Sequence, residues 1–203
     1  MYILPPHFKS ATNPVSYRDA YNDILQHHRR APQTSASSIM IIVAPDVDAL
    51  CAARMLETLL RQDNITHRIR PVAGLTALVD VKNELLNYHD VSKSLHSFGC
   101  SVLTILYLQL HTLILINIGA FLELPSDEWF GTFPEHLKIH VIDSQRPLNL
   151  SSLFGGGPAE RIIVWDDGGI EKLKQEREAW LALEVSRSPH LDASISSYSI
   201  VRP

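Results

Sequence analysis

In the stretch Ile39-Met-Ile-Ile-Val-Ala-Pro-Asp-Val-Asp-Ala-Leu50, an apolar run leads directly into two closely spaced carboxylates. The run has the length and the near-continuous hydrophobicity of a strand that is buried on both faces. Asp46 and Asp48 follow it at the start of a predicted helix over 48–61. Ligands of open α/β sheets bind beyond the carboxyl ends of such strands, so both aspartates are candidate site residues.

The same pattern recurs at three later points in the chain. The run 113–117 ends in the amide of Asn117, the run 138–143 ends in the carboxylate of Asp143, and the run 161–167 ends in two aspartates. Carboxyl ends of parallel strands lie at one edge of a sheet, so we expect these side chains to converge with Asp46 and Asp48. A cluster of oxygen ligands on rigid elements is typical of sites for divalent cations and phosphate esters.

The remaining periodicity predicts helices between the strands. An amphipathic helix over 16–30 precedes the first strand, and a strand over 66–72 with a helix over 75–88 completes a right-handed βαβ unit. We therefore expect an α/β fold, a mostly parallel sheet with helices on both faces. The helix over 48–61 is predicted to turn five apolar residues inward: Leu50, Ala53, Leu56, Leu59 and Leu60.

Composition limits the possible functions. The chain has 203 residues, of which 45% are hydrophobic and 20% charged, as in ordinary globular domains. A net charge of −4 argues against a protein that binds nucleic acid by itself, because such binding depends on neutralising phosphates. Two cysteines indicate neither a disulfide framework nor a zinc site, and the N-terminus lacks the apolar core of a signal peptide.

Several motifs resemble those of the DHH phosphoesterase superfamily, and most closely those of its cell division control protein 45 family. The motifs are Asp46-Val-Asp-Ala49, Ile116-Asn-Ile-Gly-Ala120 and Val141-Ile-Asp-Ser-Gln-Arg-Pro147, with Tyr17-Arg-Asp-Ala-Tyr21 and Trp165-Asp-Asp-Gly168 in the matching order. The resemblance covers about residues 1–184 with one interruption. It implies that the chain holds a DHH-phosphoesterase-like N-terminal domain.

The chain departs from the active DHH enzymes at metal-binding positions. Those enzymes hold two manganese ions with an Asp-x-Asp pair, a further Asp and an Asp-His-His triplet. Asn117 stands where they have the further Asp, and Ser144 and Gln145 stand where they have the two histidines. The resemblance is therefore to the non-catalytic branch, which implies no enzymatic activity, no cofactor and no bound metal. The expected degenerate site comprises Asp46, Asp48, Asn117, Asp143, Ser144, Gln145 and Arg146.

Each of these residues also has a structural interpretation. We expect Asp46 to cap a helix rather than to bind a metal, and Asn117 to tie neighbouring loops together. Arg146 is predicted to pair with Asp143 or Asp46 in place of cations, because clustered carboxylates need a countercharge. His140 is expected to be a core histidine. The Asp166-Asp-Gly-Gly169 segment is explained by turn chemistry.

The resemblance implies a scaffold subunit of the replicative helicase. Its expected partners are the minichromosome maintenance ring, the GINS complex and replication-origin loading factors, in the nucleus. Single-stranded DNA contact is possible in the full-length family protein, and no membrane association is expected. Two alternatives stay open: an active metal-dependent DHH phosphoesterase, and a single-pass membrane protein spanning 102–118, where the apolar run is nearly long enough to cross a bilayer.

Two segments lie outside the resemblance. Joining Asp90 directly to Leu110 restores the expected loop and strand, so residues 91–109 are a predicted insertion of 19 residues. The insertion and the segment beginning at Val185 both open with Val-Ser. The codons for this dipeptide can match the nucleotide sequence at a splice-site border. We interpret both as translated retained introns. The predicted organisation is a domain over 1–184, interrupted at 91–109, followed by a disordered tail over 185–203.

Overall fold

The computed structural model describes residues 1–6, 15–30, 39–95 and 110–187. Within them lies a six-stranded sheet with the order β1-β6-β5-β4-β2-β3, in which all neighbouring strands are parallel. The predicted α/β class and parallel sheet are therefore confirmed. The strands are β1 (Tyr2–Ile3), β2 (Ile39–Val43), β3 (His67–Pro71), β4 (Thr112–Ile116), β5 (Lys138–Ile142) and β6 (Ile162–Trp165).

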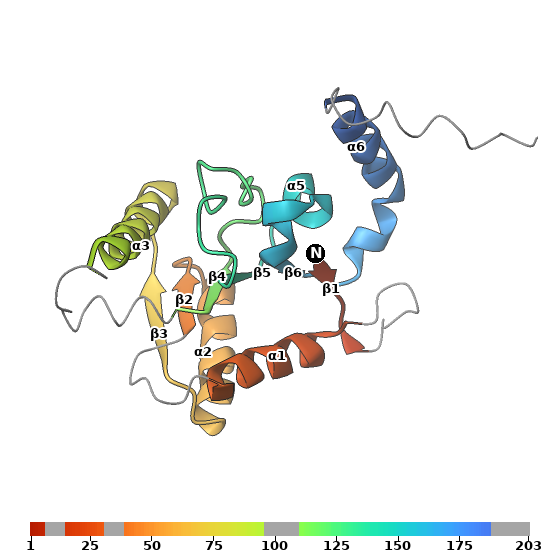
Figure 1. Ribbon diagram of the computed structural model, residues 1–203. Helices are drawn as coiled ribbons and strands as arrows, with labels where there is room; N and C mark the ends of the chain where they lie inside the picture. Colours follow the sequence, from red (N-terminus) through yellow and green to blue (C-terminus); the bar gives the residue numbers. More distant parts are fainter. Residues whose placement is uncertain (7–14, 31–38, 96–109, 188–203) are drawn as a thin grey trace, which may run out of the picture. The chain divides into compact units, whose positions relative to one another are not determined.

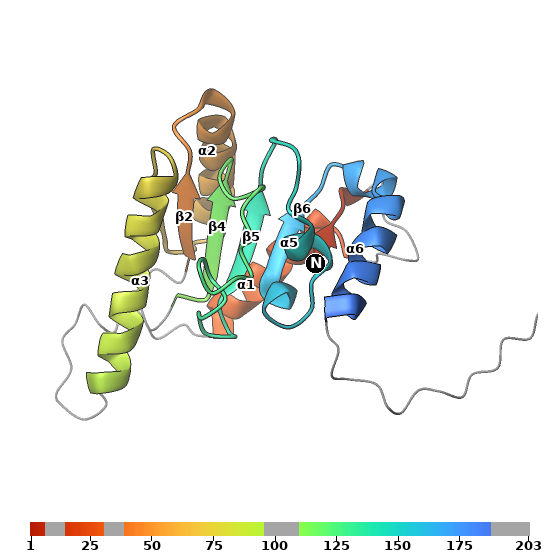
Figure 2. The ribbon, with the colours of Figure 1, turned by 90° about the horizontal axis from the view of Figure 1, so that it is seen from above.

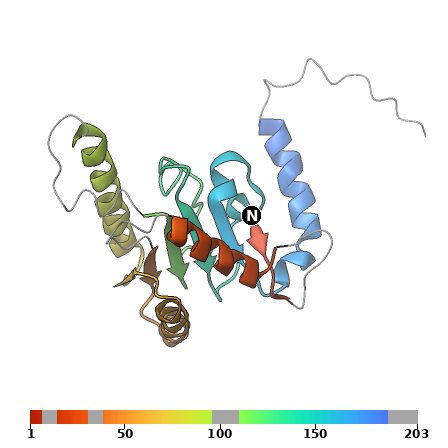
Figure 3. The same ribbon diagram turned by 60° about the horizontal axis from the view of Figure 1, so that its bottom comes forward.

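Helices cover both faces of the sheet, as the sequence predicts. In Figure 1, α1 (Tyr17–Arg30) and α2 (Val47–Gln62) lie on one face, and α3 (Leu75–Leu95) and α5 (Leu150–Phe154) lie on the other. Figure 3 shows α1 running across the strands of its face. The 3₁₀ helix η2 (Gly157–Arg161) leads into β6.

The core is built on two adjacent inner strands of the sheet, β2 and β4. Every residue of β2 and of β4 is buried. Ile41 and Ile114 are paired in register, and both pack in the cluster that joins the sheet to α1 and α2. Such continuous apolar strands are stable only where both faces are covered, so the local sequence and the layered architecture agree.

The inward face of α2 is narrower than predicted. Its buried residues are Ala49, Ala53, Leu56 and Leu60, whereas Leu50 is 54% exposed and Leu59 is 47% exposed. The prediction was wrong for these two leucines. The helix contacts the sheet through a stripe about one residue wide per turn, and the alanines let it lie close to the strands.

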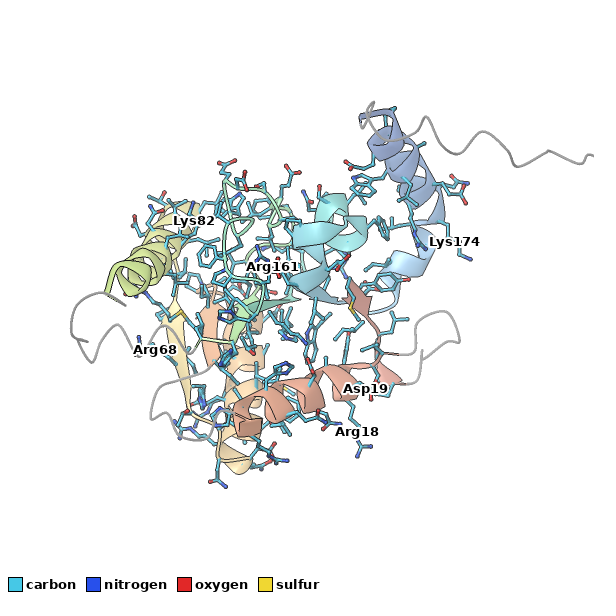
Figure 4. The ribbon with its side chains drawn as sticks, viewed as in Figure 1. Arg18, Asp19, Arg68, Lys82, Arg161 and Lys174 are labelled. Carbon is cyan, nitrogen blue, oxygen red and sulfur yellow. The ribbon has the colours of Figure 1, made fainter. Side chains whose placement is uncertain are left out.

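Arg161 fastens the segment between β4 and β5 to the start of β6. Its guanidinium donates hydrogen bonds to the main-chain oxygens of Phe130, Gly131 and Phe133. Arg161 is labelled in Figure 4. The carbonyl groups of an irregular segment are thereby satisfied without a regular ladder.

A second compact unit begins at Gly169, the first being Met1–Gly168. The second unit contains the 3₁₀ helix η3 (Gly169–Lys172) and α6 (Lys174–Arg187). Residues 188–203, most of the predicted tail, lie outside the described residues. The predicted domain boundary at residue 184 stays a prediction.

The apolar run over 102–118 is not a single membrane-spanning helix. Residues 112–116 form β4, a central strand of the sheet, and residues 102–109 lie outside the described part of the chain. Among the described residues, no helix has the length and hydrophobicity needed to cross a membrane. The prediction that 91–109 is an insertion remains untested, and α3 continues to Leu95, inside that segment.

Candidate functional site

The ends of the three central strands are level with one another. Val43 of β2 pairs with Ile116 of β4, and Ile116 pairs with Ile142 of β5. Figure 2 shows these strands side by side and pointing the same way. The strand pairing continues one residue further, because the main-chain N–H of Asn117 donates to the main-chain oxygen of Ile142 over 2.9 Å. The residues that follow each strand therefore emerge next to one another, as the sequence predicts.

Asp46 caps α2, which confirms the structural interpretation of this residue. Its backbone is extended, with φ −108° and ψ 163°, and its Oδ1 accepts a hydrogen bond of 2.8 Å from the amide of Ala49. The same oxygen accepts a hydrogen bond of 3.0 Å from Nδ2 of Asn117. One carboxylate oxygen thus satisfies a free amide of the first helical turn and binds the neighbouring strand end.

Asn117 ties three loops together, as predicted. Its φ of 51° lies in the left-handed region, which asparagine tolerates better than most residues do. While its Nδ2 donates to Asp46, its Oδ1 accepts from the amide of Ser144 at 3.1 Å and from the Ser144 hydroxyl at 3.3 Å. A side chain that donates at one end and accepts at the other suits an amide and not a carboxylate.

Both carboxylate oxygens of Asp143 accept hydrogen bonds from main-chain amides. Its Oδ2 accepts from the amide of Ala120 at 3.1 Å, and its Oδ1 accepts from the amide of Gln145 at 2.8 Å. Burial raises the pKa of the Asp143 carboxyl, while these two hydrogen bonds and the charge of Arg146 act in the opposite direction. The carboxylate therefore fastens the loop after β4 to the loop after β5.

Arg146 does not form the predicted ion pair with the carboxylate of Asp143 or Asp46. Its Nη1 donates to the main-chain oxygens of Asp143, at 3.0 Å, and Gln145, at 2.9 Å. Its Nη2 lies 3.1 Å from Oδ1 of Asp167 and 3.7 Å from Oδ1 of Asp166, which is fully buried. The buried acid that receives the countercharge is thus Asp166, after β6, whereas Asp143 is already stabilised by amides.

The segment after β6 is a turn, as predicted. Oδ2 of Asp166 accepts a hydrogen bond of 2.9 Å from the amide of Gly168, which has a φ of 100°. The main-chain oxygen of Asp166 accepts from the Tyr17 hydroxyl. Burial, followed by the charges of Asp166 and Asp167, raises the pKa of Tyr17 to about 12. Tyr17 therefore remains a donor and holds α1 against this turn.

His140 is a core histidine, as predicted. It is fully buried in the middle of β5, and its Nδ1 accepts a hydrogen bond of 3.0 Å from the indole of Trp165. Burial lowers the pKa of His140 to about 3, with a smaller effect from Lys138. The ring is thus neutral and carries its proton on Nε2.

Asp48 lies apart from the other candidate residues. It is exposed in the first turn of α2, where its charge suits the positive end of the helix dipole. Among the hydrogen bonds of the described residues, none joins Asp48 to the network. Ser144 and Gln145 do belong to it, although Gln145 contributes its main chain and not its side chain.

The residues at this edge do not fit a pair of bound metal ions. Both oxygens of Asp143 and one oxygen of Asp46 accept hydrogen bonds from amides, and Asn117 directs its amino group at Asp46. In the part of the chain that the structure describes, no three or more His, Cys, Asp or Glu side chains are grouped so that they could hold a metal ion. The network consists of hydrogen bonds that join the loops, and it is not arranged as a set of metal ligands.

Sequence reasoning missed two contacts of the network. The main-chain amide of Ala120 donates to Asp143, and Arg146 pairs with Asp166 and Asp167. The acidic pair was visible at a strand end and could have been considered as a partner for Arg146. No feature of the sequence indicates the role of Ala120, because this role depends on a main-chain amide and on the path of the loop.

The fold and the site together define a parallel α/β domain whose strand ends are joined by hydrogen bonds at one edge. Comparison with known proteins gives the family: the CDC45 family model matches residues 39–197, and the chain belongs to this family. Protein TSD2 of Mycosarcoma maydis is 38% identical over 173 residues, which are 83% of this chain and 19% of that protein.

Two further relatives agree. The Schizosaccharomyces pombe cell division control protein 45 homolog is 32% identical over 167 residues, covering 82% of this chain and 22% of that protein. The crystal structure of CDC45 from Entamoeba histolytica matches with a TM-score of 0.52 at 18% identity, over 83% of this chain and 26% of that one, and shows a common fold. The chain therefore spans about a fifth of the curated relatives it matches.

Proposed function

We propose that this chain is part of a DNA replication initiation factor and acts as a non-catalytic scaffold. Membership of the CDC45 family supports the replication role, since the similar proteins are named cell division control proteins. The observation that carries the non-catalytic role is the hydrogen bond between Asn117 and Asp46. An amide at this position donates a hydrogen bond to the carboxylate from within the chain, where a metal enzyme requires oxygen ligands that are free.

The scaffold we propose is a subunit of the replicative helicase. Its partners would be the minichromosome maintenance ring, the GINS complex and the factors that load the helicase at origins, all in the nucleus. Single-stranded DNA contact belongs to this proposal only for the longer family protein. The net charge of −4 supports protein partners over direct DNA binding by this chain alone.

Co-purification with the ring subunits and GINS tests the scaffold role. We compare this chain with a version that lacks residues 91–109 and carries the C-terminal portion found in longer relatives. The longer version is expected to retain both partners. A matched control carries Ile114→Asp, which places a charge in the buried centre of β4 and should abolish binding by unfolding the domain. Failure of the folded longer version to retain either partner would refute the scaffold role.

Manganese-dependent hydrolysis tests the opposing enzymatic reading. We expect the purified chain to show no hydrolysis of phosphodiester substrates above that of a sample carrying Asp48→Ala. Asp48 is exposed and is the aspartate of the Asp-x-Asp pair that remains outside the network, so its removal leaves the fold intact. Hydrolysis that requires manganese and disappears with Asp48→Ala would show an active phosphoesterase.

A further inference from the structure

Four histidines gather at the N-terminal edge of the sheet, opposite the edge that carries the hydrogen-bonded network. His27 and His28 lie in the last turn of α1, His111 directly precedes β4, and His136 lies two residues before β5. The rings of His111 and His136 meet edge to face, with centroids 5.5 Å apart and planes at 66°. His27 and His28 are near enough for their charges to act on His111. We call these four residues the histidine cluster.

Ionic and main-chain contacts hold the end of α1 at this edge. The Lys138 ammonium lies 2.5 Å from Oδ2 of Asp23, and the main-chain amide of Lys138 donates to the main-chain oxygen of His111 over 2.9 Å. Nδ1 of His27 donates to the main-chain oxygen of Asp23 over 2.8 Å and lies 3.3 Å from Oδ1 of the same residue. The Asp23 carboxylate is therefore already shared by an ammonium and an imidazole.

His111 is poorly placed to carry a positive charge. Its ring is half-buried, and burial lowers the pKa of His111, followed by the charges of His136, His27 and His28. Burial, followed by the charge of Arg29, likewise lowers the pKa of His28. The cluster is thus stable when its rings are neutral and becomes self-repelling when they bind protons.

The charged groups around His111 do not compensate for an added proton. They are Asp23, His27, His28 and Arg29 on α1, Glu135 and His136 before β5, and Lys138 and His140 on β5. Of the two acids, Asp23 is paired with Lys138, and Glu135 is exposed, where solvent screens its charge. Burial lowers the pKa of His140 to about 3, so His140 remains neutral in mild acid.

We propose that His111 is a proton-sensitive contact that releases the last turn of α1 from the sheet in mild acid. Neutral His111 packs against His136, whereas protonated His111 is set among basic groups and is better solvated when the end of the helix moves away. Ile24 and Leu25 are 2% and 8% exposed in the core cluster that joins α1 to the sheet. The preceding turn therefore stays in place, and the opening is local.

The direction of the pH dependence follows from the lowered pKa of His111. In the open form the ring is in water and binds a proton at the ordinary histidine value of 6.5, whereas in the closed form it binds a proton only at lower pH. The closed form is therefore fully favoured above 6.5, and its advantage is lost as the pH falls below that value.

Hydrogen exchange of the full chain, measured by mass spectrometry at pH 7.5 and pH 5.5, tests the opening. After correction for the intrinsic exchange rates, we expect the protection of residues 24–30 to fall several-fold more than that of residues 49–60 of α2, which exchange by wider unfolding. His111→Gln cannot titrate, so it should keep the protection of residues 24–30 at pH 5.5. His67→Gln, which removes a partly exposed ring at the start of β3, is the matched control and should respond as the unmodified chain does. An equal fall in both segments, or the same selective fall in His111→Gln, would overturn the proposal.

Titration of the imidazole protons by NMR tests the coupling between the rings. We expect the midpoint of His111 to lie below the ordinary histidine value and to rise in His136→Gln, which removes a neighbouring positive charge. His136 is exposed, so this substitution leaves the fold intact, and it keeps His111 itself unchanged. His67→Gln should leave the midpoint of His111 where it was. A midpoint that is not lowered, or one that does not move in His136→Gln, excludes the coupled cluster.

Discussion

The side-chain amide of Asn117 joins the loops that meet at this edge. Asn117 supplies a donor to Asp46 and an acceptor to Ser144, so it performs the bridging that a cation would perform between anionic ligands. An aspartate there would face Asp46 with two acceptors and no donor. Close carboxylates do not both ionise without a countercharge, so the amide is what makes this edge stable at neutral pH.

Asn117→Asp should therefore lower the melting temperature at pH 7. The loss corresponds to about 1–3 kcal/mol, because a partly buried hydrogen bond is replaced by a repulsion. The new pair of carboxyls has a raised pKa in the folded state, so stability is regained as the pH falls through that value. Thermal unfolding between pH 5 and pH 8 measures both effects. Asn83→Asp, an equal charge change at an exposed site of α3, is the control, and an equal loss in both variants would contradict the explanation.

His140 makes stability depend on pH in the acidic range. Its pKa is about 3 in the folded protein and near 6.5 in the unfolded chain, so between these values only the unfolded chain binds the proton. Stability must then rise with pH across this window and fall as the pH drops. His140→Gln keeps an acceptor for the Trp165 indole and removes the titration.

We expect the melting temperature of His140→Gln to change less between pH 4 and pH 7 than that of the unmodified protein. His67→Gln, which removes a partly exposed ring at the start of β3, is the matched control and should retain the original slope. A His140→Gln slope identical to the original would show that another group causes the acid sensitivity.

Among the secondary structure elements, α2 combines two different roles. Its start is fixed by Asp46, and its inner side is fixed by the alanines and leucines that pack on the sheet. The cap and the strand-end network share one carboxylate oxygen, so the position of the helix and the position of the β4 loop are coupled.

Asp46→Ala should destabilise the domain more than Asp48→Ala does. Loss of a helix cap costs about 1 kcal/mol, and Asp46→Ala additionally leaves the amide of Asn117 without its acceptor. Asp48→Ala removes only a favourable charge at the helix start, worth about 0.3–1 kcal/mol. Denaturant unfolding of both variants gives the comparison. Equal losses would mean that the shared oxygen adds nothing beyond a charge at the helix start.

For the molecule as a whole, the interruption at 91–109 should be dispensable. The described contacts of α3 with the core come from Leu78, Val81 and Leu85, all upstream of it, and β4 begins downstream at Thr112. Joining Asp90 to Leu110 shortens α3 by residues 91–95, leaves these three buried residues and β4 in place, and removes an apolar segment. We expect the shortened chain to keep its cooperative unfolding, with an unchanged or higher melting temperature. Loss of cooperativity would show that this segment is part of the fold.

Much of the architecture was predictable because it is encoded locally. The fully apolar runs of β2 and β4 identify buried parallel strands without any knowledge of their neighbours. The convergence of Asp46, Asn117 and Asp143 follows from the same pattern, since parallel strands of equal length end at one edge. The cap at Asp46 is equally local, because it lies three residues from the amide that it accepts.

The sequence by itself determined the parallel sheet, the edge where polar side chains gather, and the serine and glutamine that follow Asp143 there. Only the tertiary structure decided which partner each polar group takes. Arg146 binds the acids after β6, and Leu50 and Leu59 of α2 face solvent. The physical reason is that these outcomes depend on loop paths and on the angle at which a helix lies on the sheet, and many distant residues set both together.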